Sequence, residues 1–280
     1  MGVFYIDGEY VSEEEAVLPV DDLVVLRGYG VFDFMRTYGG RPFRLDDHIR
    51  RLQNSAALIQ LSCPWSLEEI RAIVEQTMER NGYEESNVRL LITGGESGDS
   101  ITPGDRPRLL VMVTPVKAFP VEWYREGVKV VTSDITRYIP GAKSIDYIGA
   151  ILSLNSARHK GAIESIYVDS NEVVLEGTTS NIFVVAGGRV LTPPEDILPG
   201  VTRQAVLEII EDEFSPELHT ITRQMLYGAE EVFLTSSNKE VLPVVRVDET
   251  TIGNGQPGPA TRRIMELFRN HTDQYGEKSD

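Results

Sequence analysis

Two stretches of this chain carry most of its predicted fold: Gly141-Ala142-Lys143-Ser144-Ile145-Asp146-Tyr147 and, a little over thirty positions later, Leu175-Glu176-Gly177-Thr178-Thr179-Ser180-Asn181-Ile182-Phe183. The first sets a lysine among small residues, and the second ends an apolar run with a carboxylate. Only six lysines occur in the whole chain, so few others compete with Lys143 for a chemical role. A lysine and a carboxylate in this order indicate a pyridoxal phosphate site, because that cofactor needs an amine for its aldehyde and an acid for its ring nitrogen.

The ring nitrogen and the phosphate of such a cofactor also have candidate partners. Glu176 precedes a glycine at a predicted strand end, where its carboxylate could keep the pyridine nitrogen protonated and make the ring an electron sink. The run Leu198-Pro199-Gly200-Val201-Thr202-Arg203 enters a predicted helix, whose free amides and dipole, with the Thr202 hydroxyl, can receive a phosphate. Arg51 could add positive charge, and Ser236-Ser237-Asn238 offers further hydroxyls and amides after a strand.

Each of these residues has a plainer interpretation when it is taken alone. A lysine after Gly-Ala is usually a solvated loop residue, and Glu176 before glycine could be a turn residue. Thr202 could be an ordinary helix cap worth about 1 kcal/mol. Arg51 could pair with Asp47 at helical spacing. The ordered set favours the cofactor over these separate interpretations.

Composition limits the classes of function. A formal charge of −16 over 280 residues argues against a nucleic-acid or anionic-membrane partner, since both need a basic surface. The single cysteine, Cys63, excludes an intrachain disulfide framework and fits a reducing compartment. No basic start with a long apolar core opens the chain, Ile6 does not fit a myristoylation motif, and no run approaches a membrane-spanning length. We therefore expect a soluble cytoplasmic protein, with one large domain or two moderate ones.

Hydrophobic periodicity predicts strands and helices in mixed order without a repeating βαβ unit, which favours an α+β fold. Asp7-Gly8 and Gly39-Gly40 are predicted hairpin turns, and Asp46 or Asp47 is expected to cap the helix that follows Leu45. In the first half we expect hairpin strands within 4–11, strands 30–38 and 41–44, helices 45–59 and 66–81, strands 88–93 and 108–113, and a long loop 94–107. In the second half we expect strand 128–133, helix 147–160, a strand meander 165–169, 173–176 and 180–185, helix 202–213, strand 230–235 and helix 260–270.

Several segments in one order resemble the class IV, fold-type IV aminotransferases, and the similarity covers nearly the whole chain. They are Arg27-Gly28-Tyr29-Gly30-Val31-Phe32-Asp33, His48-Ile49-Arg50-Arg51-Leu52, the Lys143 and Glu176 stretches, Gly200-Val201-Thr202-Arg203 and Thr235-Ser236-Ser237. Ordered motifs are strong evidence where any one of them is weak. The resemblance implies that Lys143 is the catalytic Schiff-base lysine and that Glu176 meets the pyridine nitrogen. It implies phosphate contacts from Arg51, Val201, Thr202 and Ser237, with Tyr147 near the ring hydroxyl.

The resemblance also implies an architecture and an assembly. A small N-terminal α/β sandwich domain would occupy residues 1–115, an interdomain loop 116–126, and a larger C-terminal pseudo-barrel domain 127–280, with pyridoxal 5'-phosphate in the cleft between the domains. A homodimer is expected, because loops of the neighbouring subunit complete the substrate pocket in this family. The implied reaction is a ping-pong transamination, in which the freed Lys143 amine moves a proton and a second 2-oxo acid recovers the amino group.

The substrate must be read from the pocket residues, among which Phe32 and Asn238 are expected. Arg27 stands where branched-chain enzymes usually have a tyrosine, and Arg89 falls on a strand that faces the substrate in the family. Two arginines indicate direct capture of a carboxylate. The pattern resembles a less usual group of D-amino acid transaminases, which predicts D-alanine and D-glutamate as donors. A structural ion pair remains the alternative for either arginine.

Other functions stay open or are disfavoured. A branched-chain L-amino acid aminotransferase is the first alternative, and an aminodeoxychorismate lyase is a further one that needs no 2-oxo acid acceptor. The four histidines lack ligand spacing with one another or with Cys63, so no metal site is expected. Gly28 and Gly30 begin a dinucleotide fingerprint, but Asp33 occupies its last glycine position. A non-enzymatic interaction protein would show no absorbance change with any amine donor.

Overall fold

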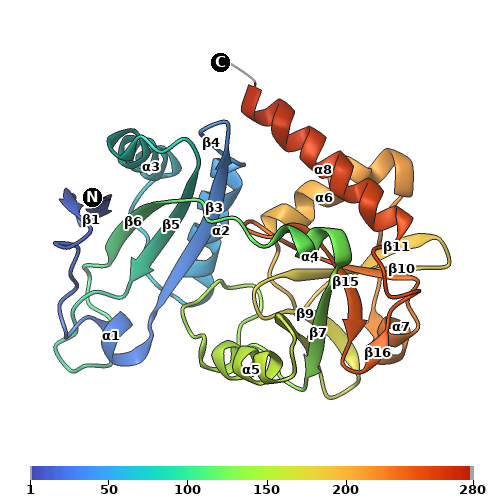
Figure 1. The fold of residues 1–280 in the computed structure, drawn as a ribbon. Coiled ribbons are helices and arrows are strands. Elements are labelled where there is room, and N and C mark those ends of the chain that lie inside the picture. The colour runs from blue at the N-terminus through green and yellow to red at the C-terminus, as the bar shows by residue number, and fades with distance from the viewer. Residues whose placement is uncertain (1, 278–280) are drawn as a thin grey trace. The chain divides into compact units, whose positions relative to one another are not determined.

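The first part of the chain forms a six-stranded antiparallel sheet (Figure 1). The computed structural model describes residues 2–277 and gives the strand order β2-β1-β6-β5-β3-β4. Both predicted hairpin turns are confirmed: Asp7 and Gly8, and likewise Gly39 and Gly40, all have positive φ, as the central residues of type I′ turns require. The strands are β1 (Val3–Ile6), β2 (Glu9–Ser12), β3 (Gly30–Tyr38), β4 (Arg41–Pro42), β5 (Ser86–Thr93) and β6 (Arg108–Pro115).

Two long helices, α2 (Leu45–Leu58) and α3 (Leu67–Asn81), pack against this sheet and bury its apolar core. The start of α3 is confirmed as a capping box, in which the Ser66 hydroxyl accepts from the Glu69 amide and the Glu69 carboxylate accepts from the Ser66 amide. The predicted cap of α2 is wrong. The helix begins after Arg44 in a left-handed conformation, so Asp46 and Asp47 lie in the first turn, where carboxylates favour the helix dipole.

The second part of the chain builds a larger sheet that curls into a half-barrel. Its order is β12-β11-β10-β14-β15-β7-β8-β9-β13, with β16 beside β15, and β7 is parallel to both β8 and β15. The strands are β7 (Val128–Ser133), β8 (Glu164–Val168), β9 (Val173–Gly177), β10 (Asn181–Ala186), β11 (Arg189–Thr192), β12 (Glu217–Leu218), β13 (Ile221–Thr222), β14 (Glu231–Ser236), β15 (Glu240–Val247) and β16 (Thr250–Thr251).

Further helices accompany the two sheets. A short helix, α1 (Leu23–Arg27), precedes β3, and the second part contributes α4 (Val121–Glu126), α5 (Ile148–His159), α6 (Val201–Phe214), α7 (Arg223–Tyr227) and α8 (Pro259–Glu277). In residues 2–277 no helix is both long enough and apolar enough to cross a membrane. The mixture of helices and mainly antiparallel strands confirms the predicted α+β class and its pseudo-barrel.

Two details of the predicted order are wrong. The strands β8, β9 and β10 do not form a meander, because β9 pairs with β8 and β13 whereas β10 pairs with β11 and β14. The segment 116–126 is not only a loop, since α4 occupies its second half. The first error arises because periodicity identifies an element but does not tell which partner it pairs with, and the second because the segment shows no clear period from which a short helix could be predicted.

The chain divides into two compact units. The first comprises Met1–Lys117, Gly141–Asp146 and Thr272–Asp280, and the second comprises Ala118–Pro140 and Tyr147–His271. The Lys143 segment and the end of α8 are therefore counted with the first unit, although the sequence prediction had assigned both to the second domain. Lys143 and Glu176 accordingly belong to different units.

Candidate active site

Lys143 is held through its main chain by β3 and α2. Its carbonyl oxygen accepts from the Phe32 amide at 2.9 Å, and Ile145 donates to the Gly30 carbonyl at 3.1 Å. On the other side the Lys143 amide donates to the Ser55 hydroxyl at 3.0 Å, which in turn donates to the Arg51 carbonyl at 2.7 Å. The backbone of the lysine is thus fixed while its long side chain extends beyond it.

The side chain of Lys143 lies on one face of the sheet with two phenylalanines and an arginine. Lys143 Nζ lies 4.7 Å from the centre of the Phe32 ring, and Arg89 Cζ lies 5.2 Å from the same centre and 5.4 Å from that of Phe34. Phe34 stands opposite Arg89 in the β3–β5 pair, and Phe32 is two positions away on the same side of its strand. We call these four residues the Phe32 face. It brings Lys143, Phe32 and Arg89 together as predicted site residues.

Arg51 is not paired with Asp47 but with Asp33, which is fully buried on β3. Arg51 Nε and Nη2 donate to the two Asp33 carboxylate oxygens at 2.8 Å each, a bidentate pair. His48 Nδ1 lies 2.6 Å from Asp33 Oδ1. The Asp33 carboxylate thus orients the Arg51 guanidinium. Because a carboxylate only accepts hydrogen bonds, the His48 imidazole must carry its proton on Nδ1.

The charges in this cluster follow from burial and pairing. Burial alone would raise the pKa of Asp33, but the charges of Arg51 and His48 and their hydrogen bonds outweigh it, so that pKa lies well below its ordinary value. Burial lowers the pKa of His48, and the neighbouring Asp33 only partly opposes this effect. At neutral pH the cluster therefore consists of a carboxylate, a guanidinium and a neutral imidazole.

In the second unit, Glu176 is held by three polar groups near the end of β9. It is 5% exposed, and its Oε2 accepts from the Leu198 amide at 3.0 Å and from Asn181 Nδ2 at 3.4 Å. Arg137 Nε lies 3.0 Å from Glu176 Oε1, an ion-pair distance without the alignment of a hydrogen bond. Asn181 also donates to the Leu198 carbonyl at 2.9 Å. The carboxylate is thereby fixed against the segment that leads into α6.

Two tyrosines belong to the electrostatic surroundings of Glu176. Burial, the largest cause, raises the pKa of Tyr167 to about 12; Arg137 opposes the rise, whereas Glu176 and Tyr147 add to it. Tyr147 stands directly before α5 and is half-buried. The Tyr167 phenol therefore remains a protonated donor near Glu176 at neutral pH.

The predicted phosphate end of the site starts at the N-terminus of α6. Gly200 is the N-cap, no side chain caps the helix, and the first helical bond runs from Gln204 to Gly200 at 2.9 Å. The amides of Val201 and Thr202 are therefore not used within the helix. The alternative role of Thr202 as the cap is wrong, because it lies in the first turn. A Cβ on Gly200 would collide with the Asn181 side-chain oxygen, so this close approach requires glycine.

An unpaired hydroxyl lies on the strand beside this helix start. Thr235 is 1% exposed, and its Oγ1 has no hydrogen-bond partner among the described residues. It stands opposite Asn181 in the β10–β14 pair, so both side chains project from the same face. Ser237 and Asn238 follow in the turn after β14. An uncapped helix start with unused hydroxyls fits a phosphate group.

Arg27 differs from the other predicted residues. It is the exposed last residue of α1, and its guanidinium donates to the Leu26 carbonyl at 2.9 Å. No hydrogen bond or ion pair within residues 2–277 joins it to the Phe32 face. No group of three or more His, Cys, Asp or Glu side chains in the same range is placed to hold a metal ion.

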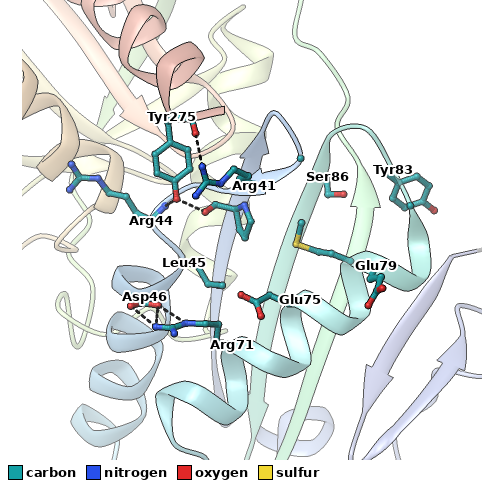
Figure 2. Close-up of a pocket in the computed structure, with 14 residues that line it drawn as sticks. Arg41, Arg44, Leu45, Asp46, Arg71, Glu75, Glu79, Tyr83, Ser86 and Tyr275 are labelled. Carbon is teal, nitrogen blue, oxygen red and sulfur yellow. Dashed lines mark hydrogen bonds and ion pairs between the residues drawn. The ribbon is translucent and has the colours of Figure 1, made fainter. Parts of the chain in front are cut away.

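A surface pocket of about 890 Å³ in the first unit contains none of the predicted site residues (Figure 2). Two of its charges pair with each other, because Arg71 Nη2 donates to both carboxylate oxygens of Asp46 at 2.7 Å. Tyr275 closes one side by donating to the Pro42 carbonyl at 2.9 Å and accepting from the Arg44 amide at 3.2 Å. Pocket size alone therefore does not identify the reactive part of this protein.

Sequence reasoning missed Asp33, His48 and Arg137 as members of the site. His48 was weighed only as a metal ligand, and Asp33 only as a departure from a glycine motif. Their signal was present in the segments Phe32-Asp33 and His48-Ile49-Arg50-Arg51, because His48 and Arg51 are three apart and share one helix face. Arg137 carried no comparable signal, since its partner Glu176 is 39 positions away.

The chain is similar to aminotransferases of more than one specificity. The family model described as amino-transferase class IV matches residues 30–247. A protein of Methanocaldococcus jannaschii named "Putative branched-chain-amino-acid aminotransferase" is 31% identical, covering 98% of each chain. A D-alanine aminotransferase of Listeria monocytogenes is also 31% identical, covering 94% of this chain and 93% of that one. The solved structure of the branched-chain amino acid aminotransferase of Escherichia coli has a TM-score of 0.92 at 28% identity, over 100% of this chain and 96% of that one.

These similarities agree with the geometry: a lysine fixed by its backbone, a buried carboxylate and an uncapped helix start are the parts that pyridoxal phosphate requires. The match extends over nearly the whole chain rather than over one motif. The chain belongs to the class IV aminotransferases, fold-type IV enzymes that use pyridoxal phosphate.

Proposed function

We propose that this aminotransferase moves an amino group between a D-amino acid of the D-alanine or D-glutamate type and a 2-oxo acid such as 2-oxoglutarate or pyruvate. The observation that carries the proposal is the Phe32 face, where Lys143 and Arg89 approach the same ring. A guanidinium there can hold a carboxylate in two parallel charge-assisted bonds, each worth roughly 1.5 to 3 kcal/mol. The D-alanine aminotransferase relatives support the same assignment.

The hand of the substrate depends on where its carboxylate is held. Lys143 reaches the Cα proton from one fixed side, because its backbone is bound to β3 and Ser55. Exchanging the carboxylate side and the side-chain side of the pocket therefore exchanges the L and D hands. In this proposal Arg89 holds the α-carboxylate, with Arg27 as a second contributor, and Phe32 and Asn238 border the rest of the substrate.

The remaining residues are assigned to the cofactor. Pyridoxal phosphate, when bound, supplies a ring that accepts electrons from Cα. In the proposed site Lys143 is the amine that binds its aldehyde, Glu176 faces the ring nitrogen and Tyr147 lies near the ring hydroxyl. Arg51, Val201, Thr202 and Ser237 bind the phosphate, the first as an oriented charge and the others through amides and hydroxyls.

Several residues of the chain then act on protons and charges. The Lys143 amine, free once the substrate amine has replaced it, would take the proton from Cα as a general base and then deliver it as a general acid to the cofactor carbon that carried the aldehyde. Asp33 keeps the Arg51 guanidinium in one orientation, so no rearrangement is needed when an anion arrives. Leu198 and Asn181 keep the Glu176 carboxylate in place through their hydrogen bonds.

The test is the absorbance spectrum of the purified protein loaded with cofactor. D-alanine, D-glutamate, L-leucine and L-glutamate are added separately without acceptor, with a Lys143→Ala variant as control. We expect the D-amino acids to remove the absorbance band of the resting cofactor. The L-amino acids should leave this band unchanged, and no added amino acid should change the spectrum of the Lys143→Ala variant. The reverse selectivity would assign the enzyme to L-substrates.

A branched-chain L-amino acid aminotransferase is the second candidate. It is favoured by the M. jannaschii relative and by the branched-chain enzymes among the similar structures. The two phenylalanines of the Phe32 face would suit an aliphatic side chain as well. A lyase acting on aminodeoxychorismate would need no acceptor, so turnover of D-alanine that depends on added 2-oxo acid distinguishes the transaminase from the lyase.

We also propose that the enzyme works as a homodimer whose substrate pocket is completed by the neighbouring subunit. The supporting observation is on α5, where Ile148, Ile151 and Leu152 are 54–71% exposed. Exposed apolar side chains grouped in this way are typical of a surface that another chain covers. Light scattering on the purified protein should give twice the chain mass, and Ile151→Glu should shift it toward the monomer; a monomeric wild type would refute the assembly.

A further inference from the structure

A buried ion pair in the second unit involves none of the residues that have been assigned a role so far. Lys239 Nζ lies 2.9 Å from Glu164 Oε2 and donates to the Thr179 hydroxyl at 2.6 Å. Glu164 is fully buried and Lys239 is 7% exposed. The Glu164 carboxylate also accepts from the hydroxyls of Thr178, Thr179 and Ser180. A buried ammonium is costly unless it is paired in this way, so its position needs a reason.

One partner of Lys239, Thr179, lies in a turn that is distant in sequence and adjacent in space, and the other, Glu164, begins β8. Thr178, Thr179 and Ser180 follow Glu176 and connect β9 to β10, whereas Lys239 ends the turn from β14 to β15. Asn181 at the start of β10 stands opposite Thr235 near the end of β14. The two turns therefore emerge at the same end of neighbouring strands.

Each turn adjoins or contains a residue of the proposed cofactor site. The first begins two positions after Glu176, and the second contains Ser237. Within the second turn, the Ser236 hydroxyl donates to Asn238 Oδ1 at 3.0 Å and accepts from the Lys239 amide at 3.3 Å. These bonds shape the turn itself, whereas the Lys239 side chain ties it to Glu164 and Thr179.

We infer that Lys239 is a positioning residue: its ammonium, bound to Glu164 and Thr179, keeps the Ser237 turn in register with the turn that follows Glu176. The inference rests on the proposed function, in which Glu176 meets the ring nitrogen and Ser237 the phosphate. Ring and phosphate are parts of one small molecule, so both contacts form fully only if the two turns keep their spacing.

The experiment compares two ligands on protein from which the cofactor has been removed. Pyridoxal phosphate and pyridoxal, which lacks the phosphate, are titrated into wild type, Lys239→Met and Lys129→Met. The control lysine belongs to the same unit, lies outside both turns and pairs with Glu249 at 3.0 Å. We expect Lys239→Met to lose roughly tenfold or more in affinity for pyridoxal phosphate and much less for pyridoxal, as for one charge-assisted bond. Lys129→Met should change neither affinity.

A second variant guards against a folding defect. Lys239→Met leaves the Glu164 carboxylate buried without its cation, whereas the double variant Glu164→Gln/Lys239→Met removes both charges. The double variant should fold and still show the selective loss for pyridoxal phosphate. A lower melting temperature with an unchanged ratio of the two affinities would make the pair purely structural and overturn the inference, as would failure of both variants to fold. Wild type that does not bind pyridoxal phosphate would instead defeat the proposed function itself.

Discussion

The Phe32 face of the first unit and the surroundings of Glu176 in the second hold their charged groups in opposite ways. On the Phe32 face, Lys143 is half-buried and Arg89 is exposed, and both end long flexible side chains on a fixed backbone. Glu176 is buried and meets the Leu198 amide, Asn181 and Arg137. Under the proposed function this difference is a division of work: the groups that move a proton or bind the substrate end long side chains lying over aromatic rings, whereas the group that sets a constant charge is buried and hydrogen-bonded.

The largest effect is expected from removing the Lys143 amine. Lys143→Ala should lower the transamination rate by roughly 10⁴-fold or more, because the group that moves the Cα proton disappears. Steady-state kinetics with D-alanine and 2-oxoglutarate measure this. Lys117→Ala, which changes an exposed lysine of the same unit, is the matched control and should keep its activity. Substantial activity in Lys143→Ala would remove the lysine from its proposed role.

Neutralising the immobilised carboxylate should have the next largest effect. Glu176→Gln keeps the size of the side chain and an oxygen for the Leu198 amide, but loses the charge proposed to hold a proton on the ring nitrogen. We expect the rate to fall on the order of 10²- to 10³-fold, as for loss of one preorganised electrostatic contact. The ultraviolet-visible spectrum of the bound cofactor should change as well. Wild-type rate and spectrum together would contradict the assignment.

The arginines divide substrate binding from cofactor binding. Arg89→Ala should raise KM for the amino acid by roughly 10- to 100-fold, the equivalent of one charge-assisted bond. Arg27→Ala should have a smaller effect, because that arginine is exposed and bound to its own helix. Cofactor content, measured by absorbance, should stay the same in both variants. Equal loss of cofactor in the two would show that they do not bind substrate.

The smallest effect concerns stability and pH. The pKa of His48 is lowered in the folded protein, so the unfolded chain takes up this proton first as the pH falls. The contribution of His48 is therefore fully present above about pH 6.5 and is lost below it, by at most about 1.4 kcal/mol per pH unit. His48→Asn retains a donor for Asp33 without a titrating group. The free energy of unfolding, measured in urea at several pH values between 7 and 5, should fall less steeply with falling pH in the variant than in the wild type. An equal dependence on pH in both proteins would argue against a neutral buried His48.

Elements with strong local signals were predictable from the sequence. The Asp7-Gly8 and Gly39-Gly40 turns, and α3 with its Ser66 to Glu69 box, depend on residues a few positions apart. The cap of α2 was predicted wrongly, because Arg44 adopts a left-handed conformation for which the sequence holds no rule. The separation of β9 from β10 was missed for a different reason: pairing is decided by strands that come later in the chain.

The same limit applies to the site. Lys143, Glu176 and the helix start at Gly200 were found through ordered motifs, which are visible without any coordinates. The partners that orient the site residues were not found in this way, because Arg137 reaches Glu176 and Asp33 reaches Arg51 only through the fold. Nothing in the sequence distinguishes Lys239 from an ordinary turn lysine. Only the fold brings its ammonium beside Glu164, 75 positions earlier.

By itself the sequence determined the class of enzyme, its cofactor and the residues proposed to touch that cofactor, because chemistry requires particular groups and those groups recur in order along the chain. Only the tertiary structure decided which charges are paired, which are buried and which remain on an accessible face. Burial and pairing depend on distances between residues far apart in the chain, and they set whether a lysine acts as a reagent, as Lys143 is proposed to do, or holds two turns together, as we infer for Lys239.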